Sequence, residues 1–368
     1  MQPLRVIISG GGTGGHIFPA VSIAKYLQKT NPKVEILFVG AKGRMEMEKV
    51  PLAGFKIVGL DIAGIQRKID WRNALLPYKL VKSLWQAHKI IKDFKPDIAI
   101  GVGGYASAPT LYMAGQMDVP TLIQEQNSYA GLTNKLLAKR ATAICVAFED
   151  MGKFFPPQKL VITGNPVRED LLDISNKREE AFKYFGLNPD KKTVLIIGGS
   201  LGARTINQVI DEGLSKIKDK DIQLVWQTGK YYFTKVQDKN SDTVKVYDFI
   251  NRMDLAYSAA DIVVSRAGAL SIAELCITGK PCILVPSPNV AEDHQTKNAQ
   301  ALLHKRAALL IKDKDAKNVL IGDILALLND AERRKQLSTN IKEMAKPNAT
   351  KSIVDEIYKV IESHNKEL

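Results

Sequence analysis

Short runs of β-branched residues alternate along this chain with longer segments of helical periodicity, and the alternation occurs in two series. The first series predicts strands at 6–9, 36–39, 98–102, 121–123, 143–146 and 161–163. The turn at 164–166 interrupts it, and a charged helical segment follows at about 177–185. The second series predicts strands at 194–197, 224–227, 244–247, 262–265 and 283–285. Strands that alternate with helices form right-handed βαβ units, so the sequence predicts an α/β protein with two parallel sheets.

The chain is long enough for two domains of this kind. Its 368 residues exceed the length over which one hydrophobic core usually grows, and 45% of them are apolar. We place an N-terminal domain at residues 1–165 and a second domain at 166–349. Near the end of the chain, Ile353, Ile357, Val360 and Ile361 recur with helical spacing. They predict a terminal helix at about 350–365 that packs back on the first domain.

Each series opens on a strand that leads through a glycine-rich loop into a helix. The first loop, GGGTGGH at 10–16, precedes a helix expected from about Phe18. The second loop, GGSLGA at 198–203, precedes a helix expected from about Arg204. Glycine lets the backbone approach a phosphate closely, and the positive end of the helix attracts the phosphate charge. A tight turn without any ligand would explain either loop equally well.

Two common classes of nucleotide-binding protein do not fit these loops. The first loop lacks the Gly-Lys-Ser/Thr ending of a P-loop, which argues against an NTPase. A dinucleotide site would need an acidic residue at the end of the second strand, and the residues there are FVGAKG at 38–43. A dehydrogenase is therefore not favoured.

His16 closes the first loop at the start of a helix. Such a residue often only bonds its own backbone. Alternatively, the helix N-terminus lowers the pKa of a histidine and keeps the ring neutral, which suits a general base. The loop alone leaves both interpretations open.

The charge of the chain points to an anionic partner. The 52 basic residues against 39 acidic ones give a net charge of +13, which suits nucleic acid, an anionic membrane surface or phosphorylated substrates. The chain contains no recognisable nucleic-acid-binding module, so we expect no nucleic acid. No stretch of about 18 apolar residues occurs and no signal peptide precedes the first strand, so any membrane contact is expected to be peripheral. Cys145, Cys276 and Cys282 are expected to be buried, reduced thiols.

Six motifs in order along the chain resemble those of the MurG family of bacterial glycosyltransferases. They are GGGTGGH at 10–16, GVGGY at 101–105, QEQN at 124–127, GNPVR at 164–168, GGS at 198–200 and SRAGALSIAE at 265–274. The resemblance implies the GT-B architecture, in which two Rossmann-like domains with parallel sheets face a deep cleft. It also implies transfer of N-acetylglucosamine from UDP-GlcNAc to undecaprenyl-pyrophosphoryl-MurNAc-pentapeptide, the step from lipid I to lipid II. Another GT-B enzyme, such as a UDP-GlcNAc 2-epimerase or a different glycosyltransferase, is the alternative.

The resemblance also implies a set of residues that bind UDP-GlcNAc. They are Thr13, Gly14, Gly15, Asn127, Arg168, Ser200, Ile250, Ala269, Leu270, Ser271, Ile272, Ala273, Glu274 and Gln295. A helix start at 269–274 suits a pyrophosphate, the Glu274 carboxylate suits the two ribose hydroxyls, and the Gln295 amide suits a sugar. The segment SPNVAE at 287–292 departs from the polar, glutamine- or histidine-rich sequence usual in the family.

For the chemistry, the resemblance implies inversion at the anomeric carbon by the muramyl 4-hydroxyl. His16 is the candidate general base, Glu125 is the second candidate for the base or for orienting the acceptor, and Tyr105 is expected to line the acceptor site. Arg168 and helix N-termini can stabilise the departing UDP. No D-x-D pair stands in a suitable loop, so we expect no metal and no cofactor.

One basic and apolar segment, at 65–94, suits a membrane surface. Its basic residues are Arg67, Lys68, Arg72, Lys79, Lys82, Lys89 and Lys92, and its apolar ones include Leu75, Leu76, Leu80, Leu84, Trp85 and Ile91. An ordinary surface helix with its apolar side in the core is the alternative. A lipid-linked acceptor favours peripheral binding to the anionic cytoplasmic leaflet of the inner membrane. Other proteins of cell-wall synthesis are candidate partners.

Overall fold

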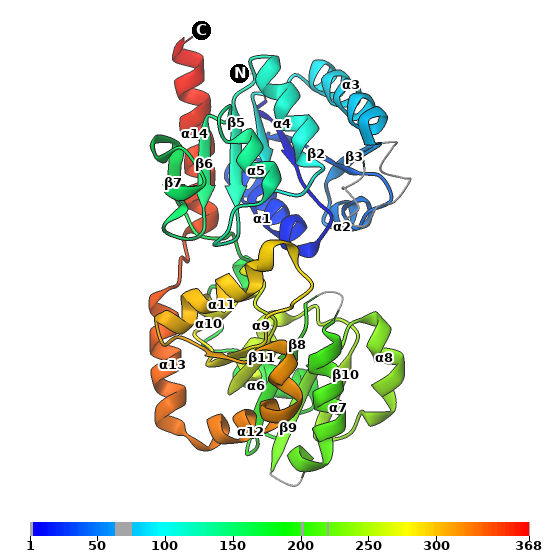
Figure 1. The fold of residues 1–368 in the computed structure, drawn as a ribbon, viewed down its shortest axis with the longest axis vertical. Coiled ribbons are helices and arrows are strands. Elements are labelled where there is room, and N and C mark those ends of the chain that lie inside the picture. The colour runs from blue at the N-terminus through cyan, green and yellow to red at the C-terminus, as the bar shows by residue number, and fades with distance from the viewer. Residues whose placement is uncertain (1–2, 63–75, 200–201, 219–220, 368) are drawn as a thin grey trace. The chain divides into compact units, whose positions relative to one another are not determined.

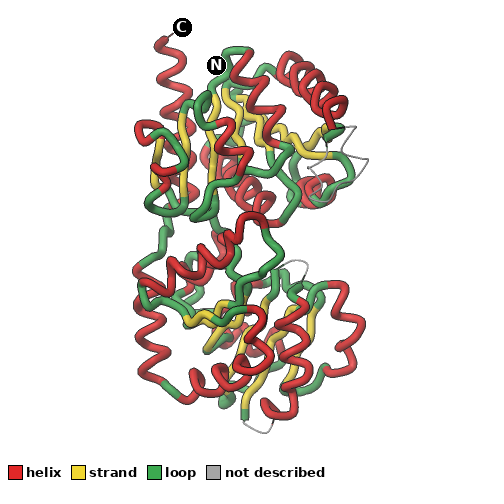
Figure 2. The backbone as a smooth tube through the Cα atoms, in the orientation of Figure 1, coloured by secondary structure: helices red, strands yellow, loops and turns green. Residues whose placement is uncertain are grey.

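A computed structural model of the chain describes residues 3–62, 76–199, 202–218 and 221–367. The chain divides into two compact units (Figure 1). Unit 1 contains residues 1–167 together with 348–368, and unit 2 contains residues 168–347. In each unit, helices enclose a sheet of strands (Figure 2).

Unit 1 is built on a seven-stranded sheet in the order β3-β2-β1-β4-β5-β6-β7, and every neighbouring pair is parallel. The strands are β1 (Arg5–Ser9), β2 (Glu35–Ala41), β3 (Lys56–Leu60), β4 (Ile98–Gly101), β5 (Thr121–Glu125), β6 (Ala143–Val146) and β7 (Leu160–Ile162). The order reverses between β1 and β4, which pair with Ser9 opposite Gly101. In open α/β sheets, ligands bind beyond the carboxyl ends of strands at such a reversal.

Helices bury both faces of this sheet. They are α1 (Gly14–Thr30), α2 (Glu46–Leu52), α3 (Leu76–Phe94), α4 (Ser107–Gln116), α5 (Leu132–Leu137) and α14 (Ala349–Glu367). Val6 and Ile8 of β1 pack with α1 and α14, whereas Ile7 between them packs on the opposite face with α3 and α4. Both sets are fully buried, so the strands read as continuous apolar runs.

The terminal helix α14 belongs to unit 1, although the chain reaches it only after completing unit 2. Its residues Ile353, Val354, Ile357 and Val360 are buried in the same core as α1. Unit 1 is therefore assembled from both ends of the sequence.

Unit 2 is built on a six-stranded parallel sheet in the order β10-β9-β8-β11-β12-β13. The strands are β8 (Lys192–Ile197), β9 (Ile222–Gln227), β10 (Val244–Tyr247), β11 (Ile262–Ser265), β12 (Cys282–Leu284) and β13 (Leu309–Leu310). The helices are α6 (Arg178–Phe185), α7 (Arg204–Lys218), α8 (Lys230–Val236), α9 (Met253–Ala259), α10 (Ala269–Thr278), α11 (His294–His304), α12 (Ala316–Asn329) and α13 (Ala331–Glu343). Two apolar cores, one on each face, hold the sheet.

The predicted fold class is confirmed: both units are α/β with parallel sheets. All eleven predicted strands are present within about two residues, while β3 and β13 were not predicted. The helix expected from about Phe18 begins at Gly14 instead and contains Pro19 in its second turn, where the missing N–H leaves out the helical bond to Gly15. Gly14, Gly15 and His16 thus belong to the helix rather than to the loop.

Candidate functional site

The first glycine loop lies at the reversal point of the unit 1 sheet and packs against the glycines that follow β4, at 103–104. Gly12 has φ of +87° and Gly104 has φ of +80°, in the region that favours glycine. A Cβ on Gly104 would lie 2.5 Å from the carbonyl oxygen of Gly11. The loops after β1 and β4 therefore touch through their backbones, and Gly104 could not carry a side chain without moving the loop after β1.

His16 is fixed by the loop that it closes. Its Nδ1 lies 2.9 Å from the carbonyl oxygen of Gly11 and 3.4 Å from the hydroxyl of Thr13. A carbonyl only accepts hydrogen bonds, so Nδ1 donates and, in the neutral ring, Nε2 carries the lone pair. The ring lies against Gly103, where an added Cβ would come 3.0 Å from Nε2. This tautomer is the one that a general base acting through Nε2 requires.

Glu125 ends β5, is 1% exposed, and uses its carboxylate to hold the following loop. One oxygen accepts from the N–H of Asn127 at 3.0 Å and from its side-chain amide at 3.3 Å. The other accepts from the N–H of Gly131 at 3.0 Å and from the amide of Asn134 at 2.8 Å. These four donors favour a positioning role for Glu125, with Asn127 as the group that it orients, over the role of a base.

Tyr105 follows the glycine segment after β4. A Cβ on Gly12 would lie 3.9 Å from its ring, so the ring borders the first loop. Its hydroxyl is buried and has no hydrogen-bond partner among the residues that the structure describes. Thr13, Gly14, His16, Tyr105 and Asn127 thus all lie beyond the carboxyl edge of the unit 1 sheet, on the loops and helix starts after β1, β4 and β5.

In unit 2, the start of α10 presents the predicted nucleotide site. Gly268 precedes the helix, so Ala269, Leu270, Ser271, Ile272 and Ala273 form its first turns. The N–H groups of a first turn have no partner within the helix and attract anions.

Glu274 follows in the second turn and is 9% exposed. Tyr257 donates its hydroxyl hydrogen to Oε2 at 3.0 Å, and Nη2 of Arg168 lies 3.7 Å from Oε1. Burial raises the pKa of Glu274, while Arg168 and the Tyr257 hydroxyl oppose the rise.

Arg168 connects Glu274 to the strand-end loop that carries Ile250. Its Nη1 donates to the carbonyl oxygen of Asn251 at 3.4 Å. Ile250 is 3% exposed, and its N–H donates to the side-chain oxygen of Gln227 at 2.9 Å. The amide of Gln227 in turn donates to Gly199 O at 3.2 Å, in the second glycine loop. The structure thus brings Arg168, Ile250 and Glu274 together at one edge of the unit 2 sheet.

Gln295 lies in the first turn of α11, and its side-chain oxygen accepts from the N–H of Ser287 at 2.8 Å. Three residues on, Asn298 donates to the carbonyl oxygen of Ala267 at 3.3 Å, which holds α11 beside the turn before α10. Ser200 lies outside the described residues. Glu292 and Asp293, just before α11, adopt φ of +54° and +52°. This strained backbone lies at the end of the 287–292 segment, whose sequence departs from the family pattern.

Several residues that build these sites were not found from the sequence. Tyr257 and Gln227 lie inside apolar runs, and Glu46, described below, lies in a charged stretch. Arg266 is a further example, because it pairs with Asp313 and donates to the carbonyl oxygens of Val285 and Pro286, which fixes the turn before α10. Each makes at least one of its contacts across 17 or more residues of sequence, and the local pattern carries no signal for that contact.

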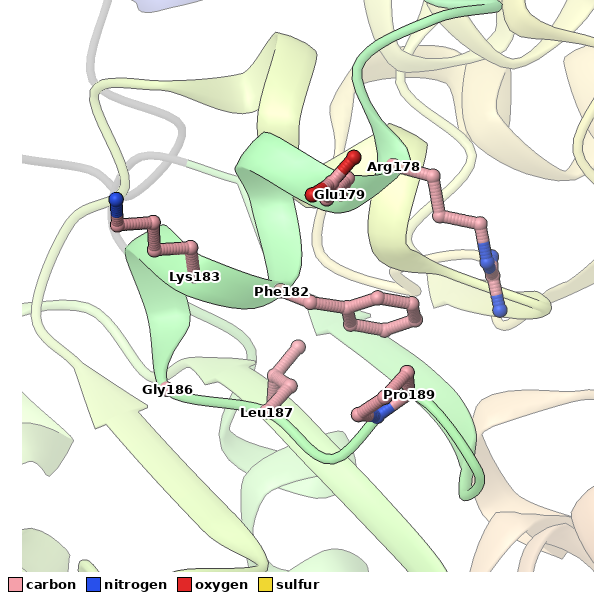
Figure 3. Close-up of a pocket in the computed structure, with 7 residues that line it drawn as sticks. All are labelled: Arg178, Glu179, Phe182, Lys183, Gly186, Leu187 and Pro189. Atoms are coloured by element: carbon pink, nitrogen blue, oxygen red, sulfur yellow. The ribbon is translucent and has the colours of Figure 1, made fainter.

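A separate pocket on unit 2 contains none of the predicted site residues (Figure 3). It is lined by Arg178, Glu179, Phe182, Lys183, Gly186, Leu187 and Pro189. The guanidinium of Arg178 lies 4.7 Å from the Phe182 ring centre and donates to Ser258 O, Ala259 O and Asp261. These contacts give Arg178 a structural role, tying α6 to the end of α9.

The described residues hold no cluster of three His, Cys, Asp or Glu side chains that could bind a metal ion. Within the same ranges, every helix is too short or too polar to cross a bilayer. All three cysteines are buried and unpaired, and burial raises the pKa of Cys276 to about 12. Such thiols are unreactive.

The chain contains two Rossmann-like units. One carries a histidine fixed by a glycine loop, and the other carries a helix start followed by a buried carboxylate. Together they match a nucleotide-sugar glycosyltransferase of the GT-B class. The Glycosyltransferase family 28 N-terminal domain matches residues 6–146, and its C-terminal domain matches 193–353. The chain belongs to this family and, within it, to the UDP-N-acetylglucosamine–N-acetylmuramyl-(pentapeptide) pyrophosphoryl-undecaprenol N-acetylglucosamine transferases.

The relatives that carry this name match almost end to end. The protein of Parabacteroides distasonis is 59% identical over 98% of this chain and 100% of its own length. That of Cytophaga hutchinsonii is 55% identical over 99% of both chains. Among solved structures, Acinetobacter baumannii MurG has a TM-score of 0.75 at 29% identity and covers 97% of this chain and 100% of its own.

The epimerase alternative is not favoured. A UDP-GlcNAc 2-epimerase from Neisseria meningitidis has a TM-score of 0.66 and covers 97% of this chain and 100% of its own. Its identity is 18%, so the likeness concerns the fold alone. A shared fold does not imply a shared reaction.

Proposed function

We propose that this protein transfers N-acetylglucosamine from UDP-GlcNAc to the muramyl 4-hydroxyl of undecaprenyl-pyrophosphoryl-MurNAc-pentapeptide, converting lipid I to lipid II in peptidoglycan synthesis. Family membership supports the reaction. The observation that carries the proposal is Glu274, a buried carboxylate held by Tyr257 and Arg168 just inside the α10 start. An acceptor for a vicinal diol next to the N-terminus of a helix, which attracts anions, matches a nucleoside diphosphate.

We assign the donor to unit 2. The N–H groups at Ala269 to Ser271 bind the pyrophosphate, and Glu274 accepts from the ribose hydroxyls. Arg168 offsets the negative charge that grows on the departing UDP, and Ile250 lies against the uracil. Ser200 contacts the nucleotide and Gln295 the sugar. From unit 1, Thr13, Gly14, Gly15 and Asn127 face the transferred sugar.

The acceptor belongs to unit 1, with Tyr105 in its site. As the 4-hydroxyl oxygen forms its bond to C1, the bond from C1 to the UDP oxygen breaks and the configuration inverts. Nε2 of His16 takes the hydroxyl proton, because the contact of Nδ1 with Gly11 O keeps the lone pair on Nε2. Charge on UDP is met by Arg168 and the helix start, so no step requires a metal.

We further propose peripheral binding to the anionic cytoplasmic face of the inner membrane. Exposed apolar side chains lie on the three helices that cover one face of unit 1. This three-helix surface consists of Tyr78, Val81 and Trp85 on α3, Tyr112 on α4, and Leu132 and Leu136 on α5. The charged residues of these helices are Lys79, Lys82, Lys89, Lys92 and Lys135 against Asp93. Apolar groups ringed by cations suit an anionic lipid surface.

The reaction is tested by incubating the protein with UDP-GlcNAc and the lipid-linked muramyl acceptor and measuring lipid II. We expect transfer by the wild type, unchanged in EDTA, and a loss of about 10²–10⁴-fold in kcat for His16→Ala. Absence of transfer by the wild type would overturn the function. Full activity of His16→Ala would remove only the base assignment, and activity that needs added Mg²⁺ would remove the metal-free mechanism.

A further inference from the structure

The first glycine loop encloses a carboxylate that no motif marks. Glu46 is the first residue of α2 and is 1% exposed. Its Oε2 accepts from the N–H of Gly12 at 2.9 Å, and its Oε1 accepts from the N–H of Ala41 at 3.0 Å. Both oxygens therefore bind backbone donors, one in the loop after β1 and one at the end of β2.

The glycines on either side make room for this side chain. A Cβ on Gly11 would lie 2.3 Å from the Glu46 carboxyl carbon, and a Cβ on Gly40 would lie 2.5 Å from its Cγ. Real Cβ atoms do not approach so closely, so any larger residue at either position would displace Glu46. These two glycines therefore make space for a protein side chain, whatever else the loop binds.

The charge of Glu46 is met by the backbone. Within the described ranges, Glu46 forms no ion pair, and its stabilising contacts are the two N–H groups and the N-terminus of its own helix. A glycine loop before a helix usually directs such N–H groups at a phosphate. Here the N–H of Gly12 points inward to a carboxylate, so this donor is taken and the loop is held rigidly.

The same loop controls His16. Gly11, whose Cα adjoins the Glu46 carboxylate, supplies the carbonyl that accepts from Nδ1 of His16 at 2.9 Å. We propose that Glu46 is a positioning residue that fixes the Gly11–Gly12 backbone and thereby keeps His16 in the tautomer with its lone pair on Nε2. The catalytic consequence rests on the proposed role of His16 as the base.

The variants Glu46→Ala and Glu46→Gln test this, with Glu48→Ala as the matched control. Glu48 lies on the same helix, but its side chain is 70% exposed and pairs with the neighbouring Lys49. Glu46→Gln keeps the size of the side chain but places an NH₂ group against one backbone N–H. Because a misplacement of about 1 Å costs roughly 10²-fold in rate, we expect kcat to fall about 10–10²-fold in both Glu46 variants. The KM for UDP-GlcNAc and the rate of Glu48→Ala should stay within about twofold of wild type.

¹⁵N spectra of histidine-labelled protein, with His16 assigned by its absence in His16→Ala, measure the tautomer directly. We expect Nδ1–H for His16 in the wild type and in Glu48→Ala, and a mixture of both tautomers in the Glu46 variants. UDP binding and circular dichroism verify that the variants are folded; should Glu46→Ala not fold, Glu46→Gln carries the test.

Wild-type kcat in a folded Glu46 variant would overturn the proposal, as would an unchanged tautomer. The spectra do not depend on His16 being a base. If His16→Ala transfers normally, the base assignment fails while the positioning of the ring by Glu46 is still decided by the spectra.

Discussion

Glu274 illustrates how burial and two neighbouring side chains together set the properties of one carboxylate. Burial in unit 2 raises its pKa, whereas Arg168 and the hydroxyl of Tyr257 favour the charged form. Tyr257 is itself fully buried, and burial beside Glu274 raises the pKa of its hydroxyl well above the usual value, so it acts as a donor. A charged Glu274 can accept hydrogen bonds from two ribose hydroxyls, and a protonated one cannot accept both equally well.

Removing the Tyr257 hydroxyl should weaken the donor site in a pH-dependent way. In Tyr257→Phe the carboxylate loses a hydrogen bond that favours its charged form, so the pKa of Glu274 rises further. A hydrogen bond to a charged group is worth about 1.5 kcal/mol, so we expect the KM for UDP-GlcNAc to rise by up to about tenfold, with the full effect at low pH. The defect should grow as the pH falls through the raised pKa, because binding requires the ionised form. Steady-state kinetics from pH 8 to pH 6 measure it.

Tyr232→Phe is the matched control. This tyrosine also donates to a carboxylate, Asp211, at 3.3 Å, but it lies on α8 and touches none of the predicted donor residues that the structure describes. Its KM for UDP-GlcNAc should not change. A pH-independent effect of Tyr257→Phe, or an equal effect of both variants, would contradict the role assigned to Tyr257.

The residues that sequence could identify are those within continuous motifs. The 10–16 and 265–274 segments mark His16 and Glu274 because the glycines and the helix start that present them are adjacent in the chain. Tyr257, Gln227 and Glu46 were not identified because each bonds a partner that is distant in the sequence and that only the folded sheet brings close. Whether the predicted residues bind donor and acceptor stays a prediction until the variants are assayed.

At the scale of elements, central strands were predictable and edge elements were not. β4 and β8 are buried on both faces and read as apolar runs. β3 lies at the edge of the unit 1 sheet with mixed exposure, and β13 has two residues, so neither gives a strong pattern. The start of α1 was placed late because Gly14 and Gly15 suggest a loop, whereas in the structure they form the first turn of the helix.

The terminal helix α14 should be essential to unit 1. Ile357 is fully buried in the core shared with α1. Truncating a buried isoleucine leaves a cavity, so Ile357→Ala should destabilise unit 1 by about 2–5 kcal/mol. Hydrogen exchange followed by mass spectrometry would show faster exchange in peptides of β1 and α1 and unchanged exchange in β8 and β9.

On the same helix, Lys359 has a 72% exposed side chain, and Lys359→Ala should change stability by less than about 0.5 kcal/mol. Uniform exchange changes across both units would show that α14 stabilises the chain as a whole rather than unit 1.

At the scale of the whole molecule, the net charge of +13 matters by where it lies. The basic segment predicted at 65–94 is described from residue 76 onward, as α3. The two sides of this helix differ: Ala87 and Ile91 pack into the core, whereas Tyr78, Val81 and Trp85 are exposed. Lys82 pairs with Asp61 at 3.0 Å, and together with Lys42 it holds the pKa of that carboxyl well below its usual range. Part of the positive charge of α3 is therefore already balanced by Asp61.

Vesicle binding separates a local surface from net charge. Reversing Lys79, Lys82 and Lys89 to glutamate should weaken binding to anionic vesicles roughly 10²-fold or more, at about 1 kcal/mol per cation removed. Reversing the exposed Lys216, Lys305 and Lys335 of unit 2 changes the net charge equally and should have a much smaller effect.

Trp85→Ser, which removes a 65% exposed side chain, should weaken binding without altering its salt dependence. Cosedimentation at low and high salt measures all three, since ions screen the attraction beyond about 10 Å at 0.1 M. Equal losses in the two triple variants would mean that total charge governs binding and that the three-helix surface does not.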